Sequence, residues 1–408
     1  MNKILFTLIG LLSLQNLQAQ RIHSELIRRD IDFLASDALE GRGTSTVAEK
    51  KAAAYIATQF EAMQLLPKGN KGYYHLFQFR YNPNVHDTNT TLLKSRTGRN
   101  VIGFLDNQKE YTVVIGAHYD HLGLGMDHNS LDANPEGKIH NGADDNASGV
   151  AGMLELARYF ANNGITENYN FLFMAFSGEE LGLVGSKKWC ENPTYPLQKI
   201  NYMINLDMVG RYESDKKLLV YGVGTSSNWI THLEAVKGNM ALKFDSSGIG
   251  PSDQTSFYLK GIPVLHFFTG QHSDYHKPGD DAMKINENGE AQIMELITDL
   301  VFRLDSKPKL DFLKTKETAS TKMSFKVTLG IMPDYVFDGE GLRIDGVTEG
   351  KPAARAGIQQ GDIIRRIGDE AVKHVQGYMK ILNGLEKGKR YPVEVVRDGK
   401  TLVLEVTF

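Results

Sequence analysis

Apolar residues recur along the first three quarters of the chain with two different spacings. Helical spacing occupies six stretches: 22–36, 48–63, 148–163, 182–189, 228–237 and 290–306. Residues 72–117 are β-rich, and apolar runs typical of buried strands occupy five stretches: 111–117, 170–176, 202–209, 218–224 and 262–268. Thr46 and Glu49 have the spacing of a capping box ahead of the second helix. Because strands alternate with helices, we predict an α/β fold with a doubly wound, largely parallel sheet and helices on both faces.

The last quarter of the chain has a different pattern. Residues 305–322 are rich in Lys, Thr and Ser and have little apolar periodicity, which is typical of a linker. Short alternating strands then occupy 324–331, 341–348, 362–368, 391–399 and 401–408. With one helix near 375–385, roughly 85 residues of this kind form a complete small domain. We therefore predict a large domain at 20–305, a linker at 306–322 and a small, mostly β domain at 323–408.

The first residues have the pattern of a secretory signal peptide. Lys3 gives a positive start, Ile4 to Leu14 is an apolar run, and Ala19 closes a small-residue cleavage site. The run is too short to span a membrane as a helix. We expect residues 1–19 to be removed and the protein to be exported to a periplasmic or extracellular space, with no membrane span.

Composition narrows the functional classes. The formal net charge is -3 and no basic stripe is present, so neither nucleic acid nor an anionic membrane surface is an expected partner. Hydrophobic content of 41% and charged content of 23% fit a globular protein. Cys190 is the single cysteine, so no intrachain disulfide can form. Its sequence neighbours supply no base, and we interpret it as a packed small residue.

Five polar patches follow apolar runs. They are VVIGAHYDHLG around His118, NGADDNASG around Asp145, FMAFSGEELG around Glu179 and Glu180, INLDMVGR around Asp207, and HSDYHKPGD around His276. Ligands of an open α/β sheet bind outside the carboxyl ends of its strands. Two histidines and three carboxylates, with one more carboxylate beside them, suit two zinc ions and a base. A single such patch is common in a capped loop, but five in this order indicate a two-metal hydrolase.

These patches resemble the motifs of the co-catalytic di-zinc aminopeptidase family (clan MH peptidases), whose relatives include glutamate carboxypeptidases and glutaminyl cyclases. H-x-D, G-x-D-D-N-x-S-G, G-E-E-x-G-L-x-G-S, N-x-D-M-x-G and Y-H-x-P-x-D all stand intact within roughly residues 25–305. The resemblance implies two Zn²⁺ per chain. It places His118 and Asp207 on one zinc and Glu180 and His276 on the other, with Asp145 bridging both.

The resemblance also assigns a division of labour between two adjacent glutamates. Neighbouring side chains cannot point the same way in extended or turn backbone, so Glu180 can coordinate while Glu179 takes a proton from the metal-bridging water and returns it to the leaving amine. Asp144 competes with Asp145 for the bridging role. The family pattern places the ligand immediately before Asn146, which favours Asp145.

Other residues near the patches are expected to support the reaction. Asp120 lies two residues after His118 and is expected to accept a hydrogen bond from its imidazole; a solvent-facing loop aspartate is the alternative. Tyr275 is expected to donate to the tetrahedral oxyanion or to form a wall of the pocket. Asp253 resembles a further active-site acid of the family, and His272 lacks the Y-H-x-P context of a ligand. The remaining histidines of these regions are assigned to loops or packing: His121, His128, His140 and His266.

Residues from about 323 to 408 resemble a PDZ domain. Leu329-Gly330-Ile331 occupies the place of the carboxylate-binding loop, and GKPAARAGIQQGDIIRRIGDEAV resembles the PDZ core stretch. Such a loop can capture a peptide or protein C-terminus by strand addition, with the helix near 376–385 as the other wall of the groove. The loop departs from the G-L-G-F form, and the alternative is a domain that only packs on the large domain or on another copy.

Together these features predict a zinc-dependent exopeptidase acting on peptide substrates, and an aminopeptidase in the first place. A carboxypeptidase or dipeptidase on the same scaffold stays open, because the metal machinery does not fix which terminus is held. No arginine cluster for a substrate carboxylate stands out except Arg211 beside the Asp207 patch. A non-catalytic peptide-binding protein acting through the PDZ domain is the alternative from another class, and the intact Glu179 argues against it.

Overall fold

The structure, a computed structural model, describes residues 22–81, 94–127, 129–315, 327–333, 339–347, 350–373 and 375–408. The predicted signal peptide, His128 and part of the predicted linker (316–322) lie outside the described residues. The described chain forms two sheets with separate apolar cores. Across these ranges, no helix combines the length and the apolar character that crossing a membrane requires.

The larger sheet has nine strands within the described residues. They are β1 (Leu66–Pro67), β2 (Tyr74–Tyr81), β3 (Lys94–Leu105), β4 (Thr112–His118), β5 (Asn170–Phe176), β6 (Ile200–Leu206), β7 (Leu218–Tyr221), β8 (Leu242–Asp245) and β9 (Val264–Phe268). The order is β1-β3-β5-β4-β6-β9-β7-β8, and β2 also pairs with β3. The central strands β5, β4, β6 and β9 run parallel. The α/β fold class with its parallel central sheet is therefore confirmed.

Strand direction changes on both sides of that parallel centre. β3 is antiparallel to β5 and to β2, and β7 is antiparallel to β9. Tyr81 at the end of β2 pairs with Lys94 at the start of β3, as in antiparallel strands that follow one another along the chain. The sequence pattern, which gives no strand direction, did not anticipate these antiparallel pairs.

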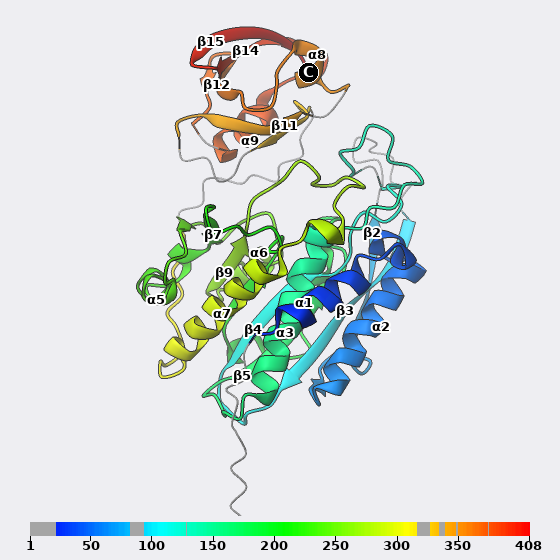
Figure 1. Ribbon diagram of the computed structural model, residues 1–408, viewed down its shortest axis with the longest axis vertical. Helices are drawn as coiled ribbons and strands as arrows, with labels where there is room; N and C mark the ends of the chain where they lie inside the picture. The colour runs from blue at the N-terminus through cyan, green and yellow to red at the C-terminus, as the bar shows by residue number, and fades with distance from the viewer. Residues whose placement is uncertain are drawn as a thin grey trace, which may run out of the picture.

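Helices cover both faces of the large sheet. They are α1 (Ser24–Leu34), α2 (Val47–Ala62), α3 (Gly149–Asn162), α4 (Val184–Glu191), α5 (Trp229–Val236), α6 (Gln254–Tyr258) and α7 (Glu287–Leu304). Helices α1, α3 and α7 lie together in front of the central strands of the sheet in Figure 1. Side chains of α4 and α6, including Trp189 and Phe257, pack on the opposite face with Val114 of β4. Successive residues of β4 thus enter different cores, as the alternation of side chains along a strand requires.

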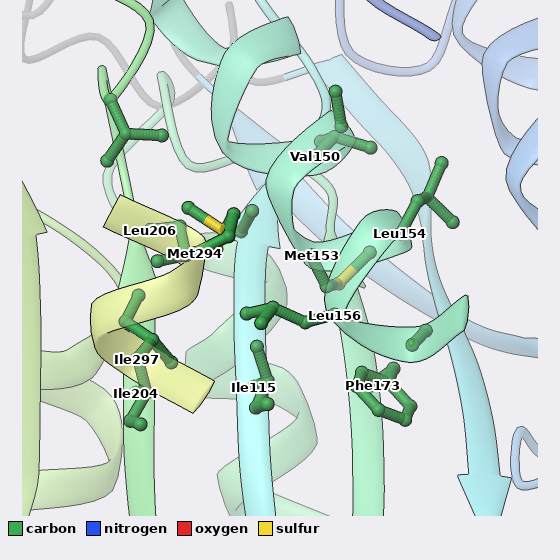
Figure 2. Packing of buried hydrophobic residues seen from close by; sticks show 14 of the residues in the cluster. Ile115, Val150, Met153, Leu154, Leu156, Phe173, Ile204, Leu206, Met294 and Ile297 are labelled. Carbon is green, nitrogen blue, oxygen red and sulfur yellow. The ribbon is translucent and has the colours of Figure 1, made fainter. Parts of the chain in front are cut away.

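The core beneath α3 and α7 fixes the two helices on the strands that carry the site. Figure 2 shows Val150, Met153 and Leu154 of α3 above the sheet, with Ile115 of β4 and Phe173 of β5 below. The same view shows residues of β6 and α7: Ile204, Leu206, Met294 and Ile297. All of these side chains are fully buried. Each contributes about 1.5–3 kcal/mol of burial free energy, so the strand ends are held by a rigid base.

The capping box ahead of α2 forms and also reaches the loop after β5. The Thr46 Oγ1 accepts the N–H of Glu49 at 3.1 Å, and the Glu49 carboxylate accepts the N–H of Ser45 at 2.7 Å. The return bond therefore goes to Ser45 and not to Thr46. Glu49 is buried and also accepts the hydroxyl of Ser177, the first residue after β5. Burial raises the pKa of Glu49 to about 8, against the opposing hydrogen bond from Ser177.

The C-terminal domain is a small antiparallel sheet with two short helices. Its elements are β10 (Ile331–Pro333), β11 (Leu342–Val347), α8 (Pro352–Ala356), β12 (Ile363–Ile367), β13 (Glu370–Ala371), α9 (Val375–Gly384), β14 (Arg390–Arg397) and β15 (Lys400–Thr407). The order is β10-β11-β12-β14-β15, with β13 paired to β12. Residues 324–326 of the predicted strand at 324–331 lie outside the described residues, and residues 327–330 form no strand. β10 begins at Ile331, directly after Gly330, whose backbone is left-handed with a φ of 74°.

Candidate metal centre

The predicted ligands lie together because their strands end at one edge of the sheet. His118 is the last residue of β4 and pairs with Phe176, the last residue of β5. Asp207 follows directly after β6, whose end is in register with the end of β9. Parallel strands bring their carboxyl ends to one edge, which is where open α/β sheets place their ligands.

Three of the predicted residues form what we call the first metal position. The Nε2 atom of His118 lies 3.3 Å from Oδ1 of Asp145 and 3.4 Å from Oδ1 of Asp207. One donor atom from each residue lies within 4.8 Å of the others. His118 is 1% exposed, and its Nδ1 donates to the backbone carbonyl of Asp120 at 3.1 Å, which leaves Nε2 free to bind.

The other oxygen of Asp145 faces what we call the second metal position. The Nε2 atom of His276 lies 3.2 Å from Oδ2 of Asp145 and 3.1 Å from Oε2 of Glu180. The Nδ1 of His276 donates to the carbonyl of Asn129 at 2.9 Å, so Nε2 again faces the carboxylates. Asp145 therefore presents one oxygen to each donor set, which is the arrangement of a bridging carboxylate.

The spacing of these donors fits zinc. Zinc binds imidazole nitrogen and carboxylate oxygen at about 2.0–2.2 Å with tetrahedral geometry, which separates two ligand atoms by about 3.3 Å. The four nitrogen–oxygen separations in the two positions run from 3.1 to 3.4 Å. The nitrogen–oxygen separations in each donor set thus match the spacing of two ligands on one zinc ion.

The charges of the two donor sets perturb one another strongly. Burial opposes a charge on His276, but the carboxylates of Glu180 and Asp145 outweigh it and raise the pKa of the imidazole. Burial likewise opposes the charge of Glu180, and His276 and His121 lower its pKa to about 2. Perturbed groups in a cleft mark functional sites, and carboxylates that stay ionised are the form a metal needs.

Glu179 points away from the second metal position. Its carboxylate lies 4.0 Å from Nε2 of His118, while the carboxylate of Glu180 contacts His276 and His121. Burial raises the pKa of Glu179; His118 opposes this, and the carboxylates of Glu180 and Asp253 add to it. The two adjacent glutamates therefore have different surroundings, as the resemblance implied.

Asp120 supports the site through a different contact from the one expected. Its Oδ1 lies 3.9 Å from Nδ1 of His118, beyond hydrogen-bond distance, and the imidazole donates to the Asp120 carbonyl. The carboxylate instead accepts the hydroxyl of Thr44 at 2.7 Å and the backbone N–H of Glu179 at 3.1 Å. Asp120 is completely buried, so it is not a solvent-facing loop residue. Its carboxylate positions the backbone of Glu179.

Asp144 faces away from both metal positions. Its Oδ1 accepts the N–H of Gly210 at 2.7 Å and the hydroxyl of Ser148 at 3.1 Å, and its Oδ2 lies 3.2 Å from Nε2 of His272. The backbone N–H groups of Asp144 and Asp145 both donate to Oδ2 of Asp280, at 2.9 and 3.0 Å. Asp280 thus fixes the turn so that the carboxylate of Asp145, and not that of Asp144, faces the two metal positions. Asp280 is the last residue of the Y-H-x-P-x-D motif, and this position could have indicated its role from the sequence.

A buried arginine ties together the loops that carry the ligands. Arg42 donates to the carbonyl of Tyr119 at 2.8 Å, of Asn141 at 2.7 Å and of Gly142 at 2.9 Å. A further bond reaches the carbonyl of Leu34 at 2.5 Å. Burial lowers the pKa of Arg42 to about 10, against the opposing carboxylates, so the guanidinium stays charged near neutral pH. The sequence analysis did not assign this residue.

The remaining candidates line the cavity or lie behind it. The cavity beside the metal positions has a volume of about 80 Å³, and its walls include Met208, Phe268 and Tyr275. The ring of Tyr275 stacks on that of His276 with centroids 4.0 Å apart. Asp253 is completely buried, and burial raises its pKa to about 7.

Cys190 and two of the remaining histidines lie away from the ligand atoms, whereas His121 does not. His266 lines the cavity, and burial lowers its pKa to about 4. His140 contacts the hydroxyl of Ser130 at 2.7 Å. Cys190 is buried, and burial raises the pKa of its thiol to about 12. His121, assigned to the loop, instead lies against the second metal position, with Nδ1 2.8 Å from Oε1 of Glu180.

Comparison with known proteins finds two family models along the chain. Residues 100–301 match the family model for Peptidase family M28, and residues 315–408 match that for the PDZ domain. Aminopeptidase YwaD of Bacillus subtilis (strain 168) is 30% identical over an alignment of 243 residues that covers 55% of this chain and 50% of that protein. The Alkaline phosphatase isozyme conversion protein of Escherichia coli (strain K12) is 32% identical over 45% of this chain and 51% of its own length. The chain thus spans about half the length of these two curated relatives.

Solved structures show the same fold. The aminopeptidase from Aneurinibacillus sp. strain AM-1 superposes with a TM-score of 0.55, covering 73% of this chain and 96% of that chain. The sequences are 19% identical over the match. At this identity the likeness is one of fold.

Proposed function

Because the chain carries a domain of Peptidase family M28 followed by a PDZ domain, we propose that it is a zinc-dependent aminopeptidase that removes N-terminal residues from peptides. One observation carries the proposal: the two oxygens of Asp145 face two separate donor sets. Glu179 stands beside them as a carboxylate that neither set uses.

Both metal positions are proposed to hold zinc. His118, Asp145 and Asp207 would hold one ion. Asp145, Glu180 and His276 would hold the other, and His121 lies against the same two carboxylates. When bound, a pair of zinc ions polarises a substrate carbonyl and makes water more acidic. The mixture of imidazole and carboxylate donors suits this metal.

Glu179 is proposed to transfer a proton from the attacking water to the leaving amine. The carboxylate of Asp120 holds its backbone N–H, so the base is fixed at the cavity wall. The Glu179 carboxylate lies beside the donor sets without belonging to either, so it is proposed to accept a proton from water and to return it to the leaving amine. Tyr275, whose ring stacks on His276 at the same wall, is proposed to donate its hydroxyl to the oxyanion.

The charges around the cavity favour a substrate amine over a substrate carboxylate. Asp145, Glu179 and Asp207 line the cavity, and within the described chain no Lys or Arg lies among its lining residues. Arg211, the one arginine of the patches, already binds Asp280 at 2.9 Å and Asp274 at 3.3 Å. It is therefore engaged in the scaffold, which argues against the carboxypeptidase alternative.

N-acetylation of a substrate is expected to lower kcat/KM at least about tenfold. The free α-amine makes a charge-assisted contact with the acidic wall, worth about 1.5–3 kcal/mol, and acetylation removes that charge. The measurement compares free and N-acetylated aminoacyl substrates that are otherwise identical. Equal rates on both, or a strict requirement for a free C-terminus, would move the protein to the carboxypeptidase or dipeptidase alternative.

The PDZ groove is proposed to take a peptide or protein C-terminus. β10 is an edge strand of the described sheet, and Leu329-Gly330-Ile331 leads into it. A peptide added to this edge would gain backbone hydrogen bonds, and its carboxylate would meet the loop N–H groups. Fluorescence anisotropy of the whole protein with a library of C-terminal peptides is expected to give binders that C-terminal amidation weakens at least about tenfold. If amidation leaves the affinities unchanged, the domain does not read a carboxylate.

Export of the protein is proposed from the pattern of its first residues. The positive start, apolar run and small-residue site at Ala19 support cleavage after that residue. N-terminal sequencing of the protein recovered outside the cytoplasm would locate the cleavage site, and an intact Met1 there would exclude removal.

A further inference from the structure

His121 occupies a position that loop packing alone does not explain. It follows Asp120 in the loop after β4, and it is 2% exposed. Its Nδ1 lies 2.8 Å from Oε1 of Glu180 and 3.7 Å from Oδ2 of Asp145. The imidazole is therefore buried and faces the carboxylates of the second metal position.

The two oxygens of Glu180 face different imidazoles. Oε2 lies 3.1 Å from Nε2 of His276, while Oε1 lies 2.8 Å from Nδ1 of His121. A carboxylate that accepts a hydrogen bond at one oxygen has the other oriented for a metal, which is how partners beyond the ligands tune metal sites. The rings of His121 and His276 lie 5.8 Å apart at an interplanar angle of 74°, so the two residues approach Glu180 from different directions.

The surroundings of His121 select the tautomer that donates to Glu180. Nε2 of His121 is buried and has no hydrogen-bond partner among the described residues. A buried N–H without a partner costs more than a buried lone pair without one, so the proton belongs on Nδ1. Nδ1 then donates to Oε1 of Glu180 in a charge-assisted hydrogen bond.

The backbone holds the ring in this place. The N–H of His121 donates to the carbonyl of Arg42 at 3.3 Å, and residue Gly43 forms a bridge with His121. Gly142 lies flat against the imidazole: a Cβ at that residue would collide with Cγ and Cδ2 of His121 and with the carbonyl oxygen of Asp145. Arg42 fixes Gly142 in turn through its carbonyl. The ring is therefore enclosed between two segments that the same arginine holds.

We propose that His121 is a positioning residue for the second metal position, where its Nδ1–H holds Oε1 of Glu180 and leaves Oε2 for the zinc. The inference rests on the proposed function, because it concerns the same metal centre. Removal of the donor lets the Glu180 side chain turn, so the second zinc is held less tightly. The first metal position has no contact with His121 except through Asp145, so it changes less.

The test compares two substitutions of one residue. His121→Leu removes the donor at similar volume, whereas in His121→Asn the amide nitrogen stands close to the place of Nδ1 and can still donate. Zinc affinities are measured by competition with a chromogenic chelator on the full-length protein. His121→Leu is expected to weaken one of the two zinc affinities about 10–100-fold and the other less than about threefold, and His121→Asn is expected to recover most of that loss.

Each outcome decides for or against the inference. Wild-type affinities in His121→Leu would overturn it. Equal losses in His121→Asn and His121→Leu would also overturn it, because they would make Nδ1 a metal ligand and not a donor to Glu180. If His121→Leu fails to fold, His121→Ala takes its place, with circular dichroism as the check on folding. The zinc readout needs no turnover, so a protein that binds zinc in this way but cleaves no aminoacyl substrate would refute the proposed function alone.

Discussion

Glu179→Gln is expected to lower kcat by about 10²–10⁴-fold while the zinc content of the protein stays at the wild-type value. Gln keeps the shape and polarity of the side chain but has no basic oxygen to take the proton. The Glu179 carboxylate lies 4.0 Å from Nε2 of His118, compared with 3.3 and 3.4 Å for the oxygens of Asp145 and Asp207. Since Glu179 is outside both donor sets, its replacement leaves them complete. The measurements are kcat at saturating substrate and zinc per chain by mass spectrometry on the same sample.

Glu180→Ala is the matched control, because it changes the adjacent residue with the opposite expectation. Its carboxylate contacts His276 at 3.1 Å and His121 at 2.8 Å, so its removal opens the second metal position. Zinc content is expected to fall together with activity. If Glu179→Gln emptied the site and Glu180→Ala did not, the base and the ligand would have to exchange roles.

The parallel centre of the fold could be predicted because burial on both faces leaves a continuous apolar run. Val113, Val114 and Ile115 are all fully buried, although successive residues enter different cores. The direction of a strand, in contrast, produces no recognisable pattern in the sequence. β7 is as apolar as β4, yet it is antiparallel to β9, because strand direction depends on how the chain returns to the sheet and not on its composition.

The candidate ligands could be proposed from the sequence because each stands at a fixed place relative to a strand or motif. The contacts between loops could not be predicted in this way. Arg42 binds carbonyls 77 and 100 residues away, and no local pattern encodes such a bond. His121 was assigned to the loop, since a histidine three residues after a ligand looks the same in sequence whether it faces solvent or Glu180.

The sequence predicted that Asp120 lies near the His118 imidazole but not which group of Asp120 contacts the ring. A spacing of two residues after His118 brings both its carbonyl and its carboxylate near the imidazole. The choice between them is made by Thr44 and by the N–H of Glu179, which occupy the carboxylate. Thr44 belongs to the segment ahead of α2, so the partner of Asp120 depends on how that segment packs against the loop after β4.

Asp145→Ala is expected to abolish detectable turnover and to lower the zinc content at both positions together. Wild-type protein is expected to carry about two zinc ions per chain, and chelation is expected to stop turnover until zinc is restored. Asp145 contributes Oδ1 to the first position, 3.3 Å from His118, and Oδ2 to the second, 3.2 Å from His276. Removing one side chain thus takes a ligand from each ion. Metal analysis after dialysis measures the loss.

Single-position variants give the comparison that isolates the bridging role. Asp207→Ala removes a ligand from the first position only, and His276→Ala from the second only, so each is expected to keep about one zinc per chain. Asp144→Asn keeps the shape of a side chain that faces Gly210 and Ser148, so it is expected to keep both ions. An Asp145→Ala protein that retained as much zinc as either single-position variant would show that the two sites are independent. A chelated wild-type enzyme with full activity would remove metal from the mechanism altogether.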